Sequence, residues 1–314
     1  MPDTQTDITK TYWLHALTPV HVGSGTGIGF IDLPIMREKT TRWPMAPGSA
    51  VKGVLADHYH ATDGERTEPL KRAAFGIAGN NEAGEDNSNS GALVFTDARL
   101  VCLAVCSLYG TFAWITSALA LRRLKRDLDK ADPTNKLPEP PQPLDEKILL
   151  PQYCGLEGPD KKAYLADLDI TKEEDEAKVT QANCWQKYLK EALFASPNDS
   201  WRTEFQKRFA IVNDRSFDYL CETAMQVDAR IRIDSNRKTV DKEHGALWYE
   251  ESLPAESILA GVVWCDRIYP KEAGLTQQQI VTAFCKSASL QIGGKATIGR
   301  GRVRFVTSVT EAKA

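Results

Sequence analysis

The chain has 314 residues, of which 42% are hydrophobic and 26% are charged, with a formal net charge of −3. These proportions fit a globular protein with a core of its own, and the slight acidity excludes binding of nucleic acid through bulk positive charge. No run approaches the ~18 apolar residues of a membrane span, so we expect no membrane contact. Without a visible signal peptide, and with seven cysteines but no CxxC pair, a cytoplasmic location is expected.

The hydrophobic periodicity predicts strands and helices distributed along the whole chain. Strands are expected at residues 11–18, 92–104, 225–234, 246–253, 258–265 and 302–309. Helices are expected at 49–60, with Ser49 as the N-cap, at 117–129, at 177–208 with a break near Pro197, and at 276–286. Polar or proline-rich loops are expected at 79–91 and 131–143.

This order of elements predicts an α+β fold. A strand, a helix and a strand near the start, and the same again near the end, fit a ferredoxin-like core with large insertions. The strands at 225–234 and 246–253 flank the polar residues 235–245, which predicts a long hairpin.

Two glycine-rich segments, at residues 21–38 and 290–303, are the most informative features of the chain. Glycine lets the backbone approach a ligand closely, and successive exposed N–H groups can hold phosphate oxygens. Neither segment has the G-x-G-x-x-G spacing of a dinucleotide site or the G-K-[ST] triplet of a P-loop, so a nucleotide coenzyme is not expected. A bound polyanion and a pair of tight turns in a sheet both remain open.

Three basic clusters accompany these segments. They lie at residues 122–126, at 230–238 and at the C-terminal end, with Lys295, Arg300, Arg302 and Arg304. Any one of them could be a solvated face. Their number, and their position beside glycine loops, favour contact with a nucleic-acid backbone.

Several blocks of residues carry a family resemblance. They are Leu17-Thr18-Pro19 before His21, Gly23-Ser24-Gly25, residues 31–38, Pro47-Gly48-Ser49 with Lys52-Gly53, residues 247–251 and the C-terminal glycine segment. Through these blocks, spread over roughly residues 11–305, the chain resembles the RAMP superfamily of CRISPR RNA-binding proteins. Within that superfamily it is most similar to the backbone subunit of the type III-B (Cmr) effector complex.

The resemblance implies a single RAMP domain over residues 1–314. Its parts would be an RRM/ferredoxin-like palm at about 11–60, 92–104 and 255–310, the helical insertion at about 110–224, and a protruding β-hairpin thumb at about 225–253. The implied function is that of a subunit that polymerises with copies of itself along a guide CRISPR RNA, joins other Cmr subunits, and cleaves paired single-stranded target RNA at regular intervals. A stand-alone guide-processing endonuclease that uses His21, and a non-catalytic RNA scaffold, remain as alternatives.

Asp32 is the candidate catalytic residue. It follows the first glycine loop and precedes Leu33-Pro34, where the proline restricts the backbone. A carboxylate can bind a hard metal ion or orient a hydroxyl, and RNA carries its own nucleophile, the 2′-OH. In the family the matching aspartate is needed to cut target RNA with a divalent metal ion, so the resemblance implies Mg²⁺ or Mn²⁺ at Asp32. A turn-capping aspartate is the alternative from the residues alone.

Three further residues are candidates for the same chemistry. His21 could act as a general base toward the 2′-OH, but its place just before Gly23 suits a phosphate contact, and we expect it to bind RNA. Glu250 and Glu251 could supply a second carboxylate. We expect them instead to be charges on the surface of a strand.

The start of the first helix and the C-terminal loop are expected to bind the guide RNA. A helix N-terminus offers N–H groups and a favourable dipole to a phosphate, which places Ser49 at the contact. Lys52, one turn further on, adds a point charge. The expected contacts in the C-terminal loop are Gly293, Gly294, Lys295 and Arg300. An ordinary capped helix with a surface lysine is the alternative at the first helix.

Overall fold

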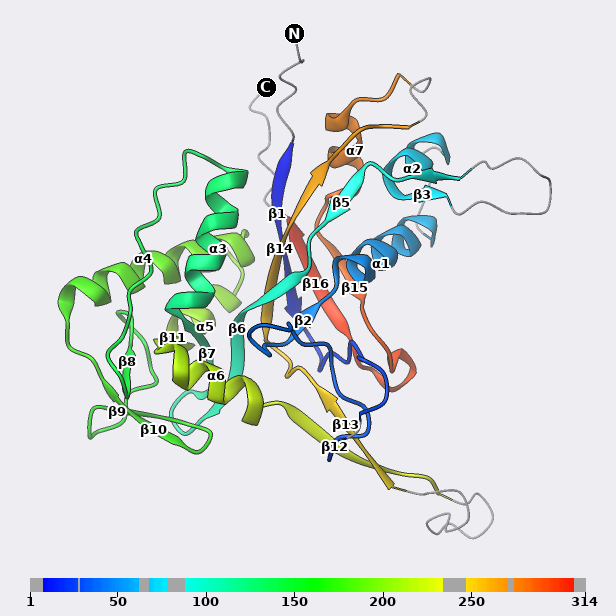
Figure 1. Cartoon of the computed structure of the whole chain (residues 1–314). Helices are drawn as coiled ribbons and strands as arrows, with labels where there is room; N and C mark the ends of the chain where they lie inside the picture. Colours follow the sequence, from blue (N-terminus) through cyan, green and yellow to red (C-terminus); the bar gives the residue numbers. More distant parts are fainter. Residues whose placement is uncertain are drawn as a thin grey trace.

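The computed structural model describes residues 8–27, 29–61, 68–77, 88–233, 247–269 and 274–307. These residues form a mixed α/β structure around one sheet of 12 strands, with two smaller sheets beside it (Figure 1). The predicted mixture of helices and strands is therefore confirmed. Within the described residues, no helix has the length and apolar character needed to cross a bilayer.

The elements have the following bounds. The strands are β1 Thr9–Ala16, β2 Met45–Ala46, β3 Gly76–Ile77, β4 Asn89–Ser90, β5 Leu93–Phe95, β6 Ala98–Ser107, β7 Thr111–Ser117, β8 Lys147–Leu149, β9 Lys162–Leu165, β10 Leu168–Lys172, β11 Phe209–Val212, β12 Gln226–Ile231, β13 Leu247–Ser252, β14 Ile258–Cys265, β15 Ala288–Gln291 and β16 Arg302–Thr307. The helices are α1 Gly48–Ala61, α2 Glu68–Phe75, α3 Ala118–Ala131, α4 Glu176–Leu193, α5 Trp201–Arg208, α6 Asp214–Thr223, α7 Gln277–Phe284 and the 3-10 helix η2 Ala296–Ile298.

The large sheet has two halves that share strand β6. In the first half β15, β16, β1, β14 and β6 lie side by side and antiparallel, with β5 also on β14 and β2 on β6. The chain order β1, α1, β6, β14, α7, β16 is that of a β-α-β-β-α-β unit. In the second half β7, β11, β8, β10 and β9 continue the sheet, with parallel pairs β7–β11 and β8–β10.

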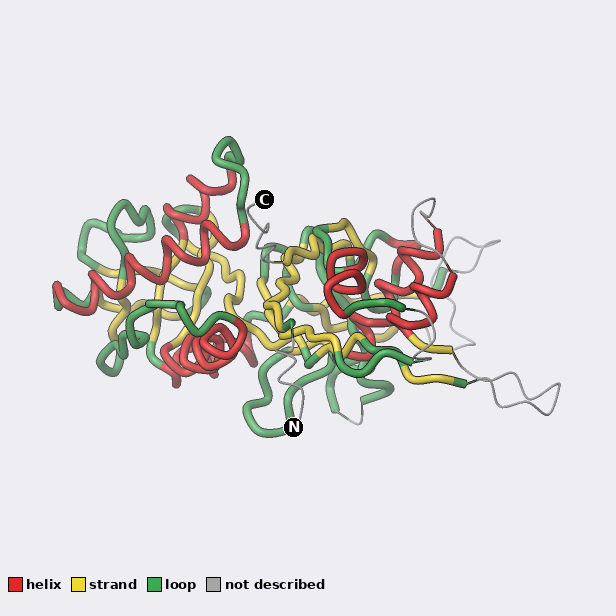
Figure 2. Tube along the Cα trace, turned by 90° about the horizontal axis from the view of Figure 1, so that it is seen from above, coloured by secondary structure: helices red, strands yellow, loops and turns green. Residues whose placement is uncertain are grey.

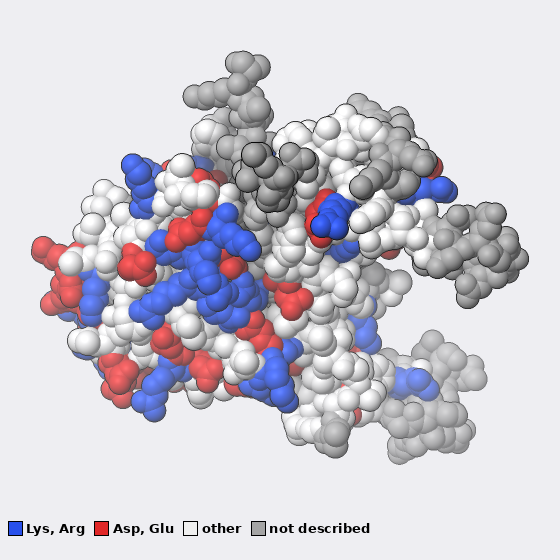
Figure 3. All heavy atoms as spheres, turned by 45° about the horizontal axis from the view of Figure 1, so that its top comes forward, with Lys and Arg blue, Asp and Glu red and all other residues white. Residues whose placement is uncertain are grey.

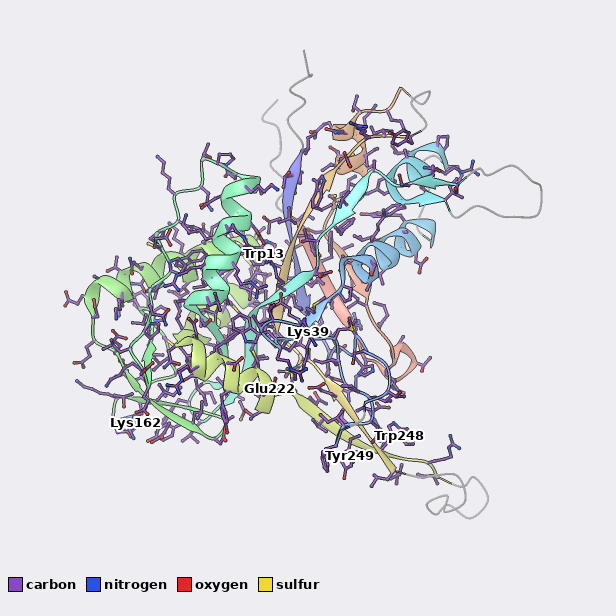
Figure 4. The ribbon with its side chains drawn as sticks, viewed as in Figure 1. Trp13, Lys39, Lys162, Glu222, Trp248 and Tyr249 are labelled. Atoms are coloured by element: carbon purple, nitrogen blue, oxygen red, sulfur yellow. The ribbon has the colours of Figure 1, made fainter. Side chains whose placement is uncertain are left out.

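Strand β1 is buried on both of its faces. Tyr12 and Leu14 belong to a hydrophobic cluster that includes residues of α1 and α7, whereas Trp13 belongs to a second cluster with residues of α3, α4 and α5. A strand covered on both faces has a continuous apolar run instead of an alternating one. Figure 2 shows strands passing through both lobes of the molecule with helices outside them, and Figure 4 labels Trp13 on the side of α3.

Several predicted elements are confirmed, and two of the helices begin directly after a capping residue. Helix α3 begins after Ser117, whose side chain accepts from the Ala120 amide. Helix α7 begins after Thr276, which forms a capping box with Gln279. The predicted helical stretch 177–208 is divided into α4 and α5 around Pro197, and β14 has the predicted bounds.

Three sequence predictions need correction. The stretch 110–224 is not simply helical, because the short strands β7 to β11 within it extend the sheet. Ser49 is not the N-cap of α1, since the helix begins at Gly48 and the Pro47 carbonyl accepts the amides of Ala50 and Val51. The strand predicted at 92–104 is interrupted between β5 and β6, where the Asp97 side chain accepts the Gly48 amide at 2.9 Å.

Two predicted loops fall partly outside the described residues. Of the predicted loop 79–91, residues 79–87 lie outside them, and Asn89–Ser90 forms β4, which pairs with β3. The predicted hairpin is present as the antiparallel pair β12–β13, and its connection at 234–246 also lies outside. In Figure 1 this pair extends away from the large sheet at the bottom of the view.

Candidate functional site

The two glycine-rich segments meet at strand β13. The N-terminal segment runs along β13, with the Leu33 amide 3.1 Å from the Tyr249 carbonyl and the Glu251 amide 3.0 Å from the Leu33 carbonyl. The C-terminal segment joins them through the Gly294 amide, which donates to the His21 carbonyl at 2.9 Å. The structure therefore brings together the sequence-predicted Asp32, His21 and C-terminal loop. Figure 4 labels Tyr249 and its neighbour Trp248 at this end of the molecule.

Asp32 is exposed and is held by the backbone of β13. Its Oδ2 accepts the Tyr249 amide at 2.7 Å, and its own carbonyl accepts the Gly27 amide at 2.8 Å. Within the described part of the chain, Oδ1 has no protein donor. The carboxylate is thus fixed in place while one oxygen remains available to a ligand.

Asp32 could contribute one ligand to a hard cation, and the described chain offers few others beside it. Across the residues that the structure describes, no three His, Cys, Asp or Glu side chains converge on a common point. Mg²⁺ is commonly held by one or two carboxylates together with substrate phosphates and waters. One exposed carboxylate oxygen fits that mode and does not fit a cage made of protein ligands.

His21 joins three segments of the site. Its Nδ1 lies 2.6 Å from the Glu251 carbonyl, which can only accept, so Nδ1 carries the proton and donates. A Cβ added at Gly23 would lie 3.0 Å from Nε2, and one added at Gly293 would lie 2.3 Å from the His21 carbonyl oxygen. With 7% of its surface exposed, His21 packs as a structural residue of the site. This burial disfavours its use as a general base.

Glu251 is a buried anchor, and the prediction of a strand-surface charge is wrong. Its Oε1 accepts from Arg37 at 2.6 Å and its Oε2 accepts the Ile35 amide at 2.9 Å. Arg37 also donates to the carbonyls of Arg42 and Cys221. The pair therefore ties the N-terminal segment to β13 and to helix α6.

Glu250 is buried as well, on the opposite face of β13, which again corrects the prediction. It accepts from Lys295 and from the Trp248 indole at 2.7 Å each, and from Arg230 at 3.3 Å. Burial raises the pKa of Glu250, but these hydrogen bonds, that of Lys295 first, outweigh it and bring the pKa to about 2. Glu250 is therefore ionised at neutral pH and cannot serve there as a general acid.

The two cations of the C-terminal loop are both paired with the β12–β13 hairpin. Lys295, whose backbone is left-handed with φ of 67°, pairs with Glu250, and Arg300 pairs with Asp228 of β12. Sequence analysis missed these partners because they lie 45 and 72 positions away along the chain. A signal was present in β12, where Asp228 and Arg230 share the face that Glu250 occupies on β13.

The start of α1 carries an unpaired cation. Lys52 is half-buried, has no ion pair among the described residues, and burial lowers its pKa. Ser49 is exposed in the first helical turn, while the Gly48 amide is already bound by Asp97. No hydrogen bond or ion pair between described residues joins Ser49 or Lys52 to the glycine segments, so the structure does not link this predicted contact directly to Asp32.

The basic cluster at 122–126 lies on helix α3, away from the β12–β13 hairpin. Figure 3 shows Lys and Arg side chains gathered on the lobe that carries α3 and α4, with acidic side chains among them. Arg123 binds Glu38 at 2.7 Å, and Lys125 binds Asp129 at 2.7 Å. Part of this basic charge therefore fastens α3 to the protein.

Phe30 is a further residue of the site that sequence analysis missed. Its ring is 79% exposed and stacks on the Tyr249 ring, with centroids 4.9 Å apart and planes at 25°. Tyr249 is the residue whose amide holds Asp32. An exposed aromatic pair therefore lies within the same short stretch of backbone as the candidate carboxylate.

Comparison with known proteins assigns the chain to a family. The RAMP superfamily model matches residues 13–304. The CRISPR system Cmr endoribonuclease Cmr4 of Pyrococcus furiosus is 30% identical over 292 residues, which is 93% of this chain and 92% of that protein.

Solved structures show the same fold. A crystal structure of oligomeric Cmr4 from Pyrococcus furiosus aligns with a TM-score of 0.68 at 23% identity, over 95% of this chain and 97% of that one. A chain in the cryo-EM structure of the type III-B Cmr-beta complex bound to cognate target RNA aligns with a TM-score of 0.66 at 19% identity, over 95% and 96%. The described fold is thus found in chains of less than 25% identity.

Proposed function

Because this chain belongs to the RAMP superfamily, we propose that it is a guide-RNA-binding backbone subunit of a type III-B effector complex that cleaves paired target RNA. The observation that carries the proposal is the Asp32 carboxylate, exposed and fixed by the Tyr249 amide at 2.7 Å where two glycine segments meet. The similarity to a protein named a Cmr endoribonuclease, 30% identical over 93% of this chain, supports the same function.

The fold suggests how the parts divide this work. The β-α-β-β-α-β unit with β1, β14 and β16 would be the palm that receives the guide, and the β12–β13 pair would be the thumb. Copies of the chain would follow one another along the guide and join other subunits of the complex. The names of two similar structures, an oligomeric Cmr4 and a Cmr complex bound to target RNA, support this arrangement.

The cleavage step needs little from the protein beyond positioning. The 2′-hydroxyl of one target nucleotide loses its proton as its oxygen attacks the adjacent phosphorus, the bond to the 5′-oxygen of the next nucleotide breaks, and that oxygen takes up a proton from water. The products are a 2′,3′-cyclic phosphate and a 5′-hydroxyl. Asp32, with Oδ2 held by the Tyr249 amide, would orient the attacking hydroxyl through Oδ1.

Asp32 would also hold a divalent metal ion, Mg²⁺ or Mn²⁺, together with phosphate oxygens of the RNA. When bound, such an ion neutralises charge that develops on the phosphate. The role of the chain is to keep one carboxylate oxygen available and the loop in place. Glu250 and Glu251 cannot contribute freely to that site, because Lys295 and Arg37 already bind them.

The guide would be bound by the residues expected from the sequence. Ser49 and Lys52 offer a hydroxyl and an unpaired ammonium at the start of α1. Lys295 and Arg300 would have to exchange Glu250 and Asp228 for phosphates, while Gly293 and Gly294, which pack on the backbone of His21, would hold the loop that carries these cations. His21 would then support the loop that binds RNA rather than act as a base.

Separate substitution of Asp32 and His21 tests the proposal. Asp32→Asn should lower target cleavage by the assembled complex at least about 100-fold, the range of a lost acid–base group, with guide binding unchanged. Asp57→Asn, at an exposed position on α1, is the matched control. Target cleavage that persists in Asp32→Asn would support the RNA scaffold, with the activity in another subunit. Loss of guide processing in His21→Ala alone would support the stand-alone endonuclease.

A further inference from the structure

The aromatic pair Phe30–Tyr249 has a surface that the rest of the described chain does not cover. Phe30 is 79% exposed although it packs against Tyr249 at a centroid distance of 4.9 Å. Keeping a large apolar ring in water is unfavourable by comparison with burying it. An offset stack of two rings at 25° leaves a flat outer face, which is a suitable surface for a third ring.

The backbone couples this pair to Asp32. Tyr249 supplies both the second ring of the stack, beneath the exposed Phe30 ring, and the amide that binds Asp32 Oδ2 at 2.7 Å. Its carbonyl accepts the Leu33 amide at 3.1 Å, which fixes the residue after Asp32 as well. Phe30 lies two positions before Asp32. A group resting on the stack would therefore be held in register with the carboxylate.

We propose that Phe30 and Tyr249 form a stacking platform for one nucleobase of the target strand, next to the phosphate that is cleaved. The inference rests on the proposed function, because it takes Asp32 to act on target RNA. Stacking on aromatic side chains is how proteins hold unstacked RNA bases, and it tolerates all four bases because each has a π-face. The platform would then allow cleavage without a fixed target sequence.

The target strand is the favoured occupant over the guide. The ring stack lies beside Asp32, so a base on it belongs to the strand whose 2′-OH the carboxylate orients. In-line attack requires the sugar to leave its helical geometry, which separates that base from its neighbours. A platform that captures the separated base stabilises the reactive geometry and not the stacked one. Phe30 is thus a positioning residue for the strand, and Asp32 remains the catalytic residue.

A coupling experiment between protein and RNA tests this inference. Phe30→Ala, and a target whose attacking nucleotide lacks its base but keeps its 2′-OH, should each slow cleavage by the assembled complex about tenfold, within the range for one base–aromatic stack. The two changes combined should slow cleavage no further than either change alone, because both remove the same contact between Phe30 and the base. Phe30→Trp should retain the wild-type rate, and Phe30→Leu, which keeps the apolar bulk, should resemble Phe30→Ala.

The matched control is Leu108→Ala, which removes a 70% exposed apolar side chain at the turn after β6. It should leave the cleavage rate and its dependence on the abasic position unchanged. Independent, multiplicative effects of Phe30→Ala and the abasic nucleotide would overturn the inference, since they would mean that Phe30 only shapes the Asp32 loop. Loss of assembly in Phe30→Ala would also overturn it, in favour of a contact between proteins.

A second readout does not depend on cleavage. A target whose attacking nucleotide carries 2-aminopurine on 2′-deoxyribose binds but lacks the nucleophile. Its fluorescence should be quenched by the wild-type complex and at least about threefold less quenched by Phe30→Ala. Equal quenching by both proteins would overturn the platform. If Asp32→Asn still cleaves while the quenching difference persists, the assignment of Asp32 fails and the platform stands.

Discussion

The N-terminal glycine segment (residues 21–38) and the C-terminal one (290–303) are fastened to neighbouring residues of the same strand, β13. Glu251 faces the first and binds Arg37 and the Ile35 amide. Glu250 faces the second and binds Lys295. Successive residues of a strand point to opposite faces, so two adjacent glutamates can hold two different loops.

The consequence differs for the two loops. In the N-terminal segment the anchoring residue is Arg37, five positions beyond Asp32, and the candidate carboxylate stays exposed. In the C-terminal segment the anchored residues are Lys295 and Arg300, the cations that were expected to bind RNA. In a glycine-rich loop, therefore, only the side chains that do not anchor the loop to the protein are available to bind a ligand.

The largest effect is expected from removal of the N-terminal anchor. Glu251→Gln keeps an acceptor for the Ile35 amide but removes the buried counter-charge of the largely buried Arg37 guanidinium and leaves only the half-exposed Glu222 near it. Breaking a buried ion pair costs about 3–5 kcal/mol, which should appear in the free energy of unfolding measured in urea. Glu222, 47% exposed and 3.7 Å from the same arginine, provides the control. Glu222→Gln should cost less than about 1 kcal/mol, and equal losses would contradict the comparison.

Glycine positions in the two segments should also respond unequally. Gly293 has φ of 79° and a Cβ there would lie 2.3 Å from the His21 carbonyl oxygen, whereas Gly25 has φ of 100° and open space around it. Gly25→Ala should cost about 1–2 kcal/mol for the left-handed backbone. Gly293→Ala should cost about 1–3 kcal/mol more, because the close approach adds a steric term. Similar unfolding free energies for the two variants would mean that the segments are not packed as described.

The elements that sequence analysis predicts well are those with local signals. The sequence predicts helices that start at Ser117 and Thr276, and α3 and α7 begin directly after these two residues, which cap them. Strands β7 to β11 lack such signals, because strands of only 3–7 residues share no common burial pattern, from the alternation of β9 to the fully buried β11. Their places are set by pairing with β6 and with one another, which is tertiary information.

At the site, sequence analysis finds the segments but not their pairing. The glycine spacing and the block at 247–251 mark three segments that do meet at β13. Whether Glu250 is a surface charge or an anchor depends on Lys295, 45 positions away. Likewise, the donor that holds Asp32 is the Tyr249 amide, 217 positions away. Local residue patterns can mark a charged strand face, as in β12, but they do not identify partners so far away along the chain.

The C-terminal anchor should be sensitive to acid. The pKa of Glu250 in the folded chain is about 2, well below the ordinary glutamate value of about 4.3. A lowered pKa contributes stability that is present above the ordinary value and is lost as the pH falls through the folded value. The difference in melting temperature between wild type and Glu250→Gln should therefore shrink between about pH 5 and about pH 2.

An exposed ion pair serves as the control for this pH dependence. Lys161 and Glu174 lie 2.6 Å apart with both side chains well exposed. Water screens such a pair, so Glu174→Gln should change the melting temperature little at any pH. A difference for Glu250→Gln that stays constant across the same range would show that Glu250 is not held as an ion by Lys295.

The smallest effect is expected in the salt dependence of guide-RNA binding, which should differ between an unpaired cation, Lys52, and a paired one, Arg300. Lys52 has no ion pair among the described residues, so its contact with a phosphate releases a counterion. Lys52→Ala should therefore lower the slope of log affinity against log salt by ~0.7.

Arg300 must leave Asp228 to reach a phosphate. The unpaired Asp228 carboxylate then takes up a cation from solution, which offsets the counterion released from the phosphate. Arg300→Ala should consequently change the slope little, while Asp228→Asn should steepen it by ~0.7, because Arg300 then starts unpaired. Equal flattening by Lys52→Ala and Arg300→Ala would mean that Asp228 does not restrain Arg300 in solution, and the contrast between the two cations would be lost.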